Sequence, residues 1–166
     1  MNKLFLLSTA AVVLFAFNAK AADSATGTAQ VEVVKAFSIE HVDGKSLNFG
    51  RLFAKAGTIT IAPNGTVTDT DKIALSGNTT SADEFKITGP AGQTATVTLG
   101  GNTATLNGSG TASGKTLTVT GLTLSDASVT PADDNPVKVT VGGSLTVAAD
   151  TTPGQYSGTY NVNITY

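Results

Sequence analysis

The sequence of 166 residues predicts an all-β domain, and three observations support that prediction. Thr and Val are abundant beyond residue 21, and their β-branched side chains favour strands over helices. Apolar and polar residues alternate in short runs, as they do in strands that bury one face. Turns rich in Gly and Asn separate these runs at short intervals, which is typical of all-β sandwiches and of closed all-β sheets.

The runs nearest the two ends of the exported part show the clearest alternation. The first, Ala25–Ile39, is longer than most strands, and one of its faces carries Ala25, Gly27, Ala29, Val31 and Val33. The last is Tyr156–Tyr166, and one of its faces carries Tyr156, Gly158, Tyr160, Val162, Ile164 and Tyr166. Each run is therefore expected to form one continuous, half-buried strand.

Shorter strands are expected between these two, wherever a brief alternating run is bounded by turn-forming residues. They are Leu47–Phe49, Thr58–Ile61, Lys72–Leu75, Glu84–Thr88, Thr94–Leu99, Thr103–Leu106, Thr116–Leu124, Val137–Val141 and Ser144–Val147. Asn64-Gly65 and Gly142-Gly143 are expected to form tight turns. Asn107–Gly114 and Ser125–Pro136 are expected to be loops, because turn-forming residues dominate both segments.

The first 21 residues have the parts of a secretory signal peptide in the usual order. Met1–Lys3 carries a positive charge, Leu4–Phe17 is an apolar run, and Asn18–Ala21 has small residues at the positions that cleavage requires. The apolar run is shorter than the roughly 20 residues of a membrane-spanning helix. We therefore expect a signal peptide over residues 1–21 and a single exported domain over residues 22–166, with no membrane-spanning helix.

The composition argues against catalysis and cofactor binding. The chain has no Cys and a single His, His41, which excludes disulfides, thiol nucleophiles and metal sites built from several histidines. The net charge of −2 gives no basic surface for nucleic acid. Gly110–Thr116 lacks both the spacing of a phosphate-binding loop and the helix that should follow it. We expect no enzyme activity, no cofactor or metal, and no nucleic-acid partner.

Four short motifs follow one another along the chain: Leu47-Asn48-Phe49-Gly50, Gly57–Gly65, Phe85–Gly89 and Pro153–Tyr166. In this order they resemble a bacterial family of secreted domains of unknown function. That family is related to spore-coat-U-like and other archaic chaperone–usher pilins, whose elements the first and last motifs also resemble. The resemblance covers nearly all of residues 22–166.

The pilin resemblance implies an immunoglobulin-like β-sandwich that lacks one strand. In those families a periplasmic chaperone first fills the gap, and the N-terminal segment of the next subunit replaces it during assembly at an outer-membrane usher. The resemblance implies that Thr26–Val34 is the donated segment, acting through Thr26, Gly27, Ala29, Val31 and Val33. It also implies that the last strand lines the groove and faces the chaperone through Tyr156, Tyr160, Val162, Ile164 and Tyr166.

We therefore expect an exported structural or adhesive subunit that passes through the periplasm to the cell surface, where it joins copies of itself or related subunits in a fimbrium. Two features differ from the pilins. Spore-coat-U-like pilins carry a disulfide that starts near the position of Phe37, and this chain has no Cys. Many other pilins have an aromatic residue at the penultimate position, whereas in this chain the aromatic residue, Tyr166, is the last one.

Two alternatives remain open from the sequence. The first strand could pair within its own sheet instead of a neighbour's. The protein could also be a self-contained secreted sandwich, without enzyme activity, that binds carbohydrate or another protein.

Overall fold

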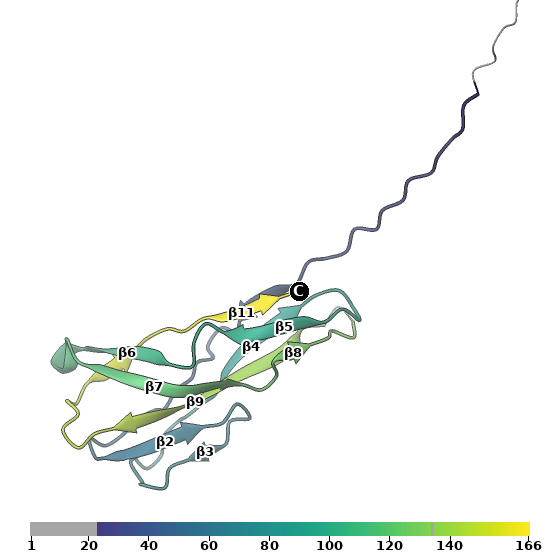
Figure 1. Cartoon of the computed structure of the whole chain (residues 1–166). Helices are drawn as coiled ribbons and strands as arrows, with labels where there is room; N and C mark the ends of the chain where they lie inside the picture. Colours follow the sequence, from purple (N-terminus) through teal and green to yellow (C-terminus); the bar gives the residue numbers. More distant parts are fainter. Residues whose placement is uncertain (1–22, 134) are drawn as a thin grey trace, which may run out of the picture. The chain divides into compact units, whose positions relative to one another are not determined.

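A computed structural model describes residues 23–133 and 135–166 of the chain. The predicted signal peptide lies outside the described residues. The chain divides into an N-terminal unit that ends at Glu32 and a second unit over Val33–Tyr166. The second unit consists of strands and connecting segments, so the all-β prediction is confirmed (Figure 1).

The elements of the second unit are short strands and one turn of 3₁₀ helix (Figure 1). In chain order they are β1 (Ser38–His41), β2 (Gly57–Ile61), β3 (Val67–Thr68), β4 (Asp83–Thr88), β5 (Ala95–Leu99), β6 (Ala104–Ser109), η1 (Gly110–Ala112), β7 (Thr116–Leu124), β8 (Ser128–Val129), β9 (Val137–Val147), β10 (Gln155–Ser157) and β11 (Val162–Thr165).

These strands form two antiparallel sheets in a curled, sandwich-like arrangement. The larger sheet has the order β1-β4-β9-β7-β6-β10, with β2 also paired to β9 and β3 to β2. The smaller sheet has the order β11-β5-β8. The long strand β9 organises the larger sheet, because its first half pairs with β4 and its second half with β2, while β7 pairs with both halves.

Two apolar clusters fill the interior. In one, Ile87 of β4 and Val139 of β9 pack with Val97 of β5 and Val129 of β8, which joins the larger sheet to the smaller one. The other includes Ile59 of β2 and extends beneath β7 and the second half of β9. Burying one side chain of this size stabilises the fold by about 1.5–3 kcal/mol relative to leaving it exposed. The apolar face of each alternating strand therefore turns inward.

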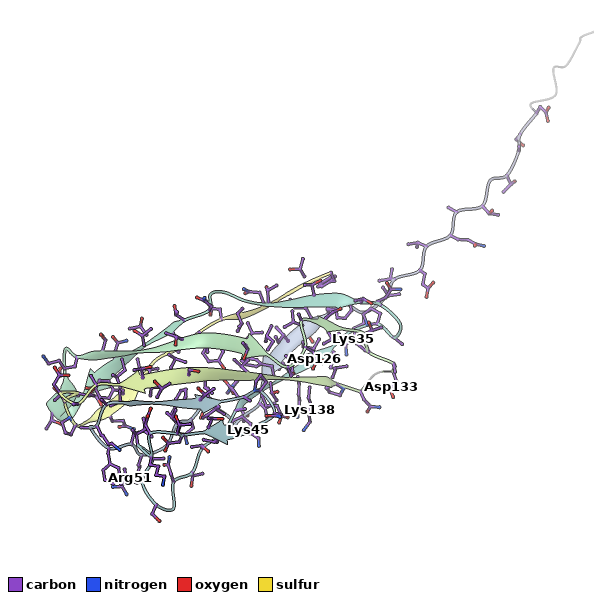
Figure 2. All side chains as sticks on the ribbon, turned by 60° about the horizontal axis from the view of Figure 1, so that its bottom comes forward. Lys35, Lys45, Arg51, Asp126, Asp133 and Lys138 are labelled. Carbon is purple, nitrogen blue, oxygen red and sulfur yellow. The ribbon has the colours of Figure 1, made fainter. Side chains whose placement is uncertain are left out.

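Charged side chains are scarce on much of the larger sheet. β2, β6, β7 and β10 contain none, and β9 carries only Lys138 (Figure 2). The Lys138 ammonium lies 2.9 Å from Glu84 Oε1, and this hydrogen bond holds the pKa of the Glu84 carboxyl below its usual range. Such a surface gives little like-charge repulsion between identical subunits.

The expected turn at Gly142-Gly143 is wrong, because β9 runs unbroken through both residues. Both glycines are buried, and a Cβ atom at Gly142 would collide with the carbonyl oxygen of Ile61. The glycine therefore permits a close approach between β9 and the end of β2, which is a common reason for glycine inside a strand. Composition alone does not distinguish this role from that of a turn.

The expected last strand, Tyr156–Tyr166, is two strands in two sheets. β10 pairs with β6 in the larger sheet, and β11 pairs with β5 in the smaller one. Alternation nevertheless continues through the break, since Tyr156, Tyr160 and Val162 are all partly buried. The chain changes partners without changing its pattern of buried faces, so the sequence shows no interruption.

The expected first strand is corrected to Ser38–His41, which pairs with β4. Residues 23–37 belong to no strand, and the side chains of Val31 and Val33 are 87% and 88% exposed. Alternation defines two faces, but a strand also needs a backbone partner. The segment 23–36 keeps its alternating pattern and presents it to solvent.

The remaining differences concern short segments. Leu47–Phe49 and Lys72–Leu75 are not strands, and each contributes one residue to an isolated bridge, Asn48 with Ser81 and Ala74 with Leu52. The expected loop at Asn107–Gly114 contains the end of β6 and η1, and the expected loop at Ser125–Pro136 contains β8. Pairing with neighbouring strands orders these polar stretches.

Candidate functional site

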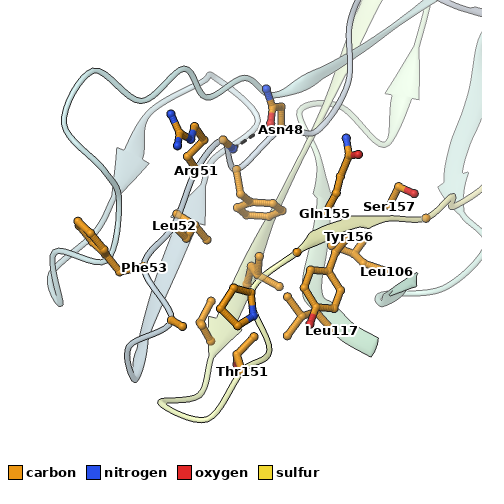
Figure 3. Close-up of a pocket in the computed structure, with 18 of the residues that line it drawn as sticks. Asn48, Arg51, Leu52, Phe53, Leu106, Leu117, Thr151, Gln155, Tyr156 and Ser157 are labelled. Atoms are coloured by element: carbon orange, nitrogen blue, oxygen red, sulfur yellow. Dashed lines mark hydrogen bonds between the residues drawn. The ribbon is translucent and has the colours of Figure 1, made fainter. Parts of the chain in front are cut away.

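A groove made of two adjoining cavities opens between two chain segments of the domain. Figure 3 shows the larger of the two. One wall is formed by residues 46–54 and the other by residues 151–160. The larger cavity has a volume of about 740 Å³ and the smaller about 370 Å³. They share four lining residues: Ser46, Leu47, Leu106 and Gly158.

The larger cavity is mainly apolar. Its floor consists of Leu106 of β6, Leu117 of β7, and Leu145 and Val147 of β9. Tyr156 covers this floor from the second wall, with its ring close to Leu117 (Figure 3). Because these apolar side chains face an open groove, a bound partner could bury their exposed surface area.

The first wall is held in place by two asparagines. Asn48 Oδ1 accepts a hydrogen bond from the main-chain N–H of Gly50, at 2.8 Å (Figure 3). Asn78 Oδ1 accepts one from the N–H of Arg51, and Asn78 Nδ2 donates one to the carbonyl of Phe49. Gly50 has a positive φ of 71°, and a Cβ atom there would collide with Asn78. The Leu47-Asn48-Phe49-Gly50 motif is thus the shaped rim of the groove.

The second wall is held by β6 and by the turn that follows β9. β10 pairs with Asn107–Ser109, and the Tyr156 hydroxyl donates to the carbonyl of Thr152 at 2.8 Å. The Thr111 hydroxyl donates to the carbonyl of Pro153 at 2.6 Å. These contacts position the Tyr156 side chain over the larger cavity.

Both walls have an unpaired backbone edge. In the second wall, β10 ends the larger sheet, so within the described strands it has no partner on its outer side. Asn48 and Leu52 form bridges on one side of their segment, to Ser81 and Ala74. An unpaired edge beside apolar side chains is a template for an added strand.

The smaller cavity contains a hydrogen-bonded cluster of three side chains. Asp83 of β4 is buried, with 5% of its surface exposed. Its Oδ1 accepts from His41 Nε2 at 2.7 Å, and its Oδ2 accepts from the Tyr160 hydroxyl at 2.5 Å. The Tyr160 ring also packs edge-on against Phe85, with centroids 6.4 Å apart. Burial and the hydrogen bond to Asp83 raise the pKa of Tyr160, so this hydroxyl ties the second wall to β4.

Nowhere in residues 23–133 and 135–166 do three or more His, Asp or Glu side chains gather as a metal site would require. No helix in the described part has the length and apolarity needed to cross a membrane.

A family model described as "Domain of unknown function (DUF4402)" matches residues 37–166, more than three quarters of the chain. The chain belongs to this family. The match starts at Phe37, the first buried residue of the described chain, so the exposed segment before it lies outside the DUF4402 match. Nothing in the match links the chain to spore-coat-U-like or chaperone–usher pilins. No curated protein and no solved structure matches the chain.

The structure brings some of the expected groove residues of this DUF4402 domain together and separates others. Tyr156 lines the larger cavity and Tyr160 the smaller one. Val162 and Ile164 instead pack against the core from β11. Tyr166 is 71% exposed, and its ring lies 5.1 Å from that of Phe37. The expected donor residues are exposed and lie in no strand: Thr26, Gly27, Ala29, Val31 and Val33.

Sequence reasoning missed most of the groove. The opposite wall and the floor come from distant positions, among them Leu52, Leu106, Leu117 and Leu145. The Leu47-Asn48-Phe49-Gly50 motif was the available signal for the opposite wall. The floor leucines look like ordinary core residues in the sequence, because nothing local indicates that no strand covers them.

Proposed function

We propose that this protein is an exported structural or adhesive subunit of the cell surface that assembles by strand donation. Its groove would accept the N-terminal segment of a neighbouring copy or of a related subunit. The observation that carries this proposal is the mainly apolar cavity of about 740 Å³ between two unpaired backbone edges. An inserted strand would pair with an edge and bury the apolar floor at the same time.

The N-terminal segment has the properties of a strand that lacks a partner. Residues 23–36 are exposed, and over residues 25–33 small or apolar residues alternate with polar ones. The side chains of Val31 and Val33 together would contribute about 3–6 kcal/mol on full burial, from about 1.5–3 kcal/mol each. This gain offsets part of the cost of ordering the segment.

Before assembly, the uncovered groove would be a hazard for aggregation. A periplasmic chaperone that covers it, and an outer-membrane usher that exchanges the chaperone for the next subunit, fit an exported subunit of this kind. In this proposal the protein passes from the periplasm into a fimbrium.

The test is a denaturing gel of surface material from cells that export the full chain, loaded with and without boiling. A ladder of multimers that collapses on boiling is expected, because strand exchange is noncovalent and the chain has no Cys. Val31→Asp should abolish the ladder and leave export intact, since a charge would enter an apolar cavity. The matched control is Gln30→Asp, which adds the same charge on the opposite face and should leave the ladder unchanged.

A normal ladder from the Val31→Asp protein would show that the donor assignment is wrong. A single monomer band from the wild type, boiled or not, would favour the second candidate function, a self-contained secreted sandwich that binds carbohydrate or protein. One observation favours that candidate: Phe53 lies at the rim of the groove and is 53% exposed (Figure 3). An exposed aromatic ring can stack against the apolar face of a ligand.

A further inference from the structure

We propose that the His41–Asp83–Tyr160 cluster sets the register of the incoming strand, so that Gly27 of a second copy lies over the cluster while Val31 and Val33 enter the larger cavity. This inference rests on the proposed function. It specifies the residues that determine where along the groove the incoming strand binds. His41, Asp83 and Tyr160 would act as positioning residues for an occupant that is another copy of this chain.

The two cavities differ in volume and in the side chains that line them. The smaller has half the volume of the larger, and polar side chains of the cluster form part of its lining. The larger is floored by leucine and valine. Two or three methyl-bearing side chains therefore fit the larger cavity, and a backbone with small side chains fits the smaller one.

The N-terminal segment is graded in the same way. Ala25, Gly27 and Ala29 are small, whereas Val31 and Val33 on the same face are larger. Positions 27 and 33 are about 20 Å apart in an extended strand, enough to reach across both cavities. Matching small to small and large to large orients the segment from the Tyr160 end of the groove toward the Tyr156 end.

The cluster resists being pushed aside. Both oxygens of Asp83 are occupied, by His41 and by Tyr160. Displacing the Tyr160 ring would leave a buried carboxylate with one donor fewer, which is costly. A side chain as large as valine at this position would have to displace the ring, so the segment could not slide by four residues to place Val31 there.

The first test compares Gly27→Val with Thr28→Val in the full chain. In the described structure a Cβ atom at Gly27 meets nothing within 4 Å, so the substitution leaves the domain itself unaffected. Overpacking at the cluster should lower the fraction of chain in boil-sensitive multimers by about tenfold or more. Thr28→Val places a valine on the opposite face with little change in volume, and it should change that fraction by less than about twofold. Normal assembly of Gly27→Val would overturn the register.

Enlarging the smaller cavity should reverse the effect. The double variant Gly27→Val with Tyr160→Ala is expected to return the multimer fraction to within about threefold of the wild type. A double variant that folds, as shown by its circular dichroism spectrum, but stays as poorly assembled as Gly27→Val would contradict contact between position 27 and Tyr160.

Cysteine pairs give a measurement that does not depend on Tyr160→Ala folding. The chain has no Cys, so every disulfide between copies must use the introduced residues, and the variants Gly27→Cys and Thr159→Cys taken singly show any pairing between identical positions. Thr159 lines the smaller cavity. In the proposed register Gly27 of the next copy lies there too, so Gly27→Cys with Thr159→Cys should give a ladder that survives boiling and collapses with reductant. Val33→Cys with Thr159→Cys should not.

The opposite result, a covalent ladder from Val33→Cys with Thr159→Cys alone, would overturn the register while leaving strand donation intact. Loss of the wild-type ladder under all conditions would instead overturn the proposed function, and the register with it. The two failures are therefore distinguishable on the same gels.

Discussion

At the scale of single residues, Asp83 shows how one buried carboxylate joins three parts of the chain. It accepts hydrogen bonds from His41 of β1, from the main-chain N–H of Glu84 in β4, and from Tyr160 in the second wall of the groove. A buried charge is costly unless it is hydrogen-bonded, so these donors explain why an Asp is tolerated there. The same arrangement disfavours ionisation of Tyr160, because a phenolate would be partly buried and adjacent to a carboxylate.

Tyr160→Phe tests this tie through its dependence on pH. The pKa of Tyr160 is raised above its usual 10.0 in the folded protein. As the pH rises above about 10, the unfolded chain loses this proton first, so the free energy of unfolding falls only above that pH. Tyr160→Phe should lose this component of the alkaline slope. At neutral pH it should be less stable by about 1–2 kcal/mol, because Asp83 loses one donor.

Urea unfolding of both proteins between pH 7 and pH 11 gives the two slopes. Equal alkaline slopes for the wild type and Tyr160→Phe would contradict a strongly raised pKa.

At the scale of elements, the first wall of the groove is not a continuous strand. Two asparagine side chains fix its shape instead. Asn48 and Asn78 bond to the main chain around Gly50. Asn78 cannot move aside without breaking its bonds to Phe49 and Arg51. The wall therefore keeps one edge unpaired and still has a defined shape.

Gly50→Ala is expected to destabilise the domain more than Gly44→Ala. Both glycines have positive φ, 71° and 75°, so both substitutions strain the backbone by about 1 kcal/mol or more. Only Gly50 would also collide with Asn78, since nothing lies within 4 Å of a Cβ atom at Gly44. The loss for Gly50→Ala should exceed that for Gly44→Ala by at least about 1 kcal/mol in denaturant unfolding. Equal losses would mean that Asn78 does not constrain this wall.

At the scale of the whole molecule, an alternating segment and a groove without a covering strand occur in one chain. The segment 23–36 is exposed, and the domain that follows carries few charges on most of its larger sheet. Both features favour association between copies, because the segment has apolar area to bury and the copies repel one another little.

Limited proteolysis should show whether the N-terminal segment is exposed in the single chain and protected after assembly. Lys35 lies in the exposed segment just before Phe37 (Figure 2). Trypsin should cut the isolated chain first after Lys35 and leave residues 36–166 intact, since strands protect the domain's backbone. In boil-sensitive multimers, that cut should be at least about tenfold slower. Equal rates in both states would contradict ordering of the segment on assembly.

Much of the fold could be predicted where a strand is bounded by local turn signals. β7 was predicted to the residue, and β2, β4 and β5 to within one residue. The failures share one cause. Gly142-Gly143 permits a close approach to Ile61, the last run changes sheets between Tyr156 and Val162, and the first run has no partner before Ser38. Each depends on which backbone lies alongside, and that information is not local.

The candidate site was predicted in part. Tyr156 and Tyr160 were expected in a groove and do line one. Val162 and Ile164 were expected there too but pack on the core, because β11 follows β5 into the smaller sheet. The floor residues Leu106 and Leu117 carried no signal.

The sequence by itself determined that this domain is all-β, which side chains of most strands turn inward, and that no disulfide can form. It did so because side-chain alternation and the absence of Cys are properties of neighbouring residues or of composition. Only the tertiary structure decided that a groove exists, since the same cavities are lined by Leu47 and Gly158, which are more than a hundred residues apart in the sequence. The floor is uncovered because no strand of the domain lies over it. The local sequence of a strand does not specify which other strands will lie next to it.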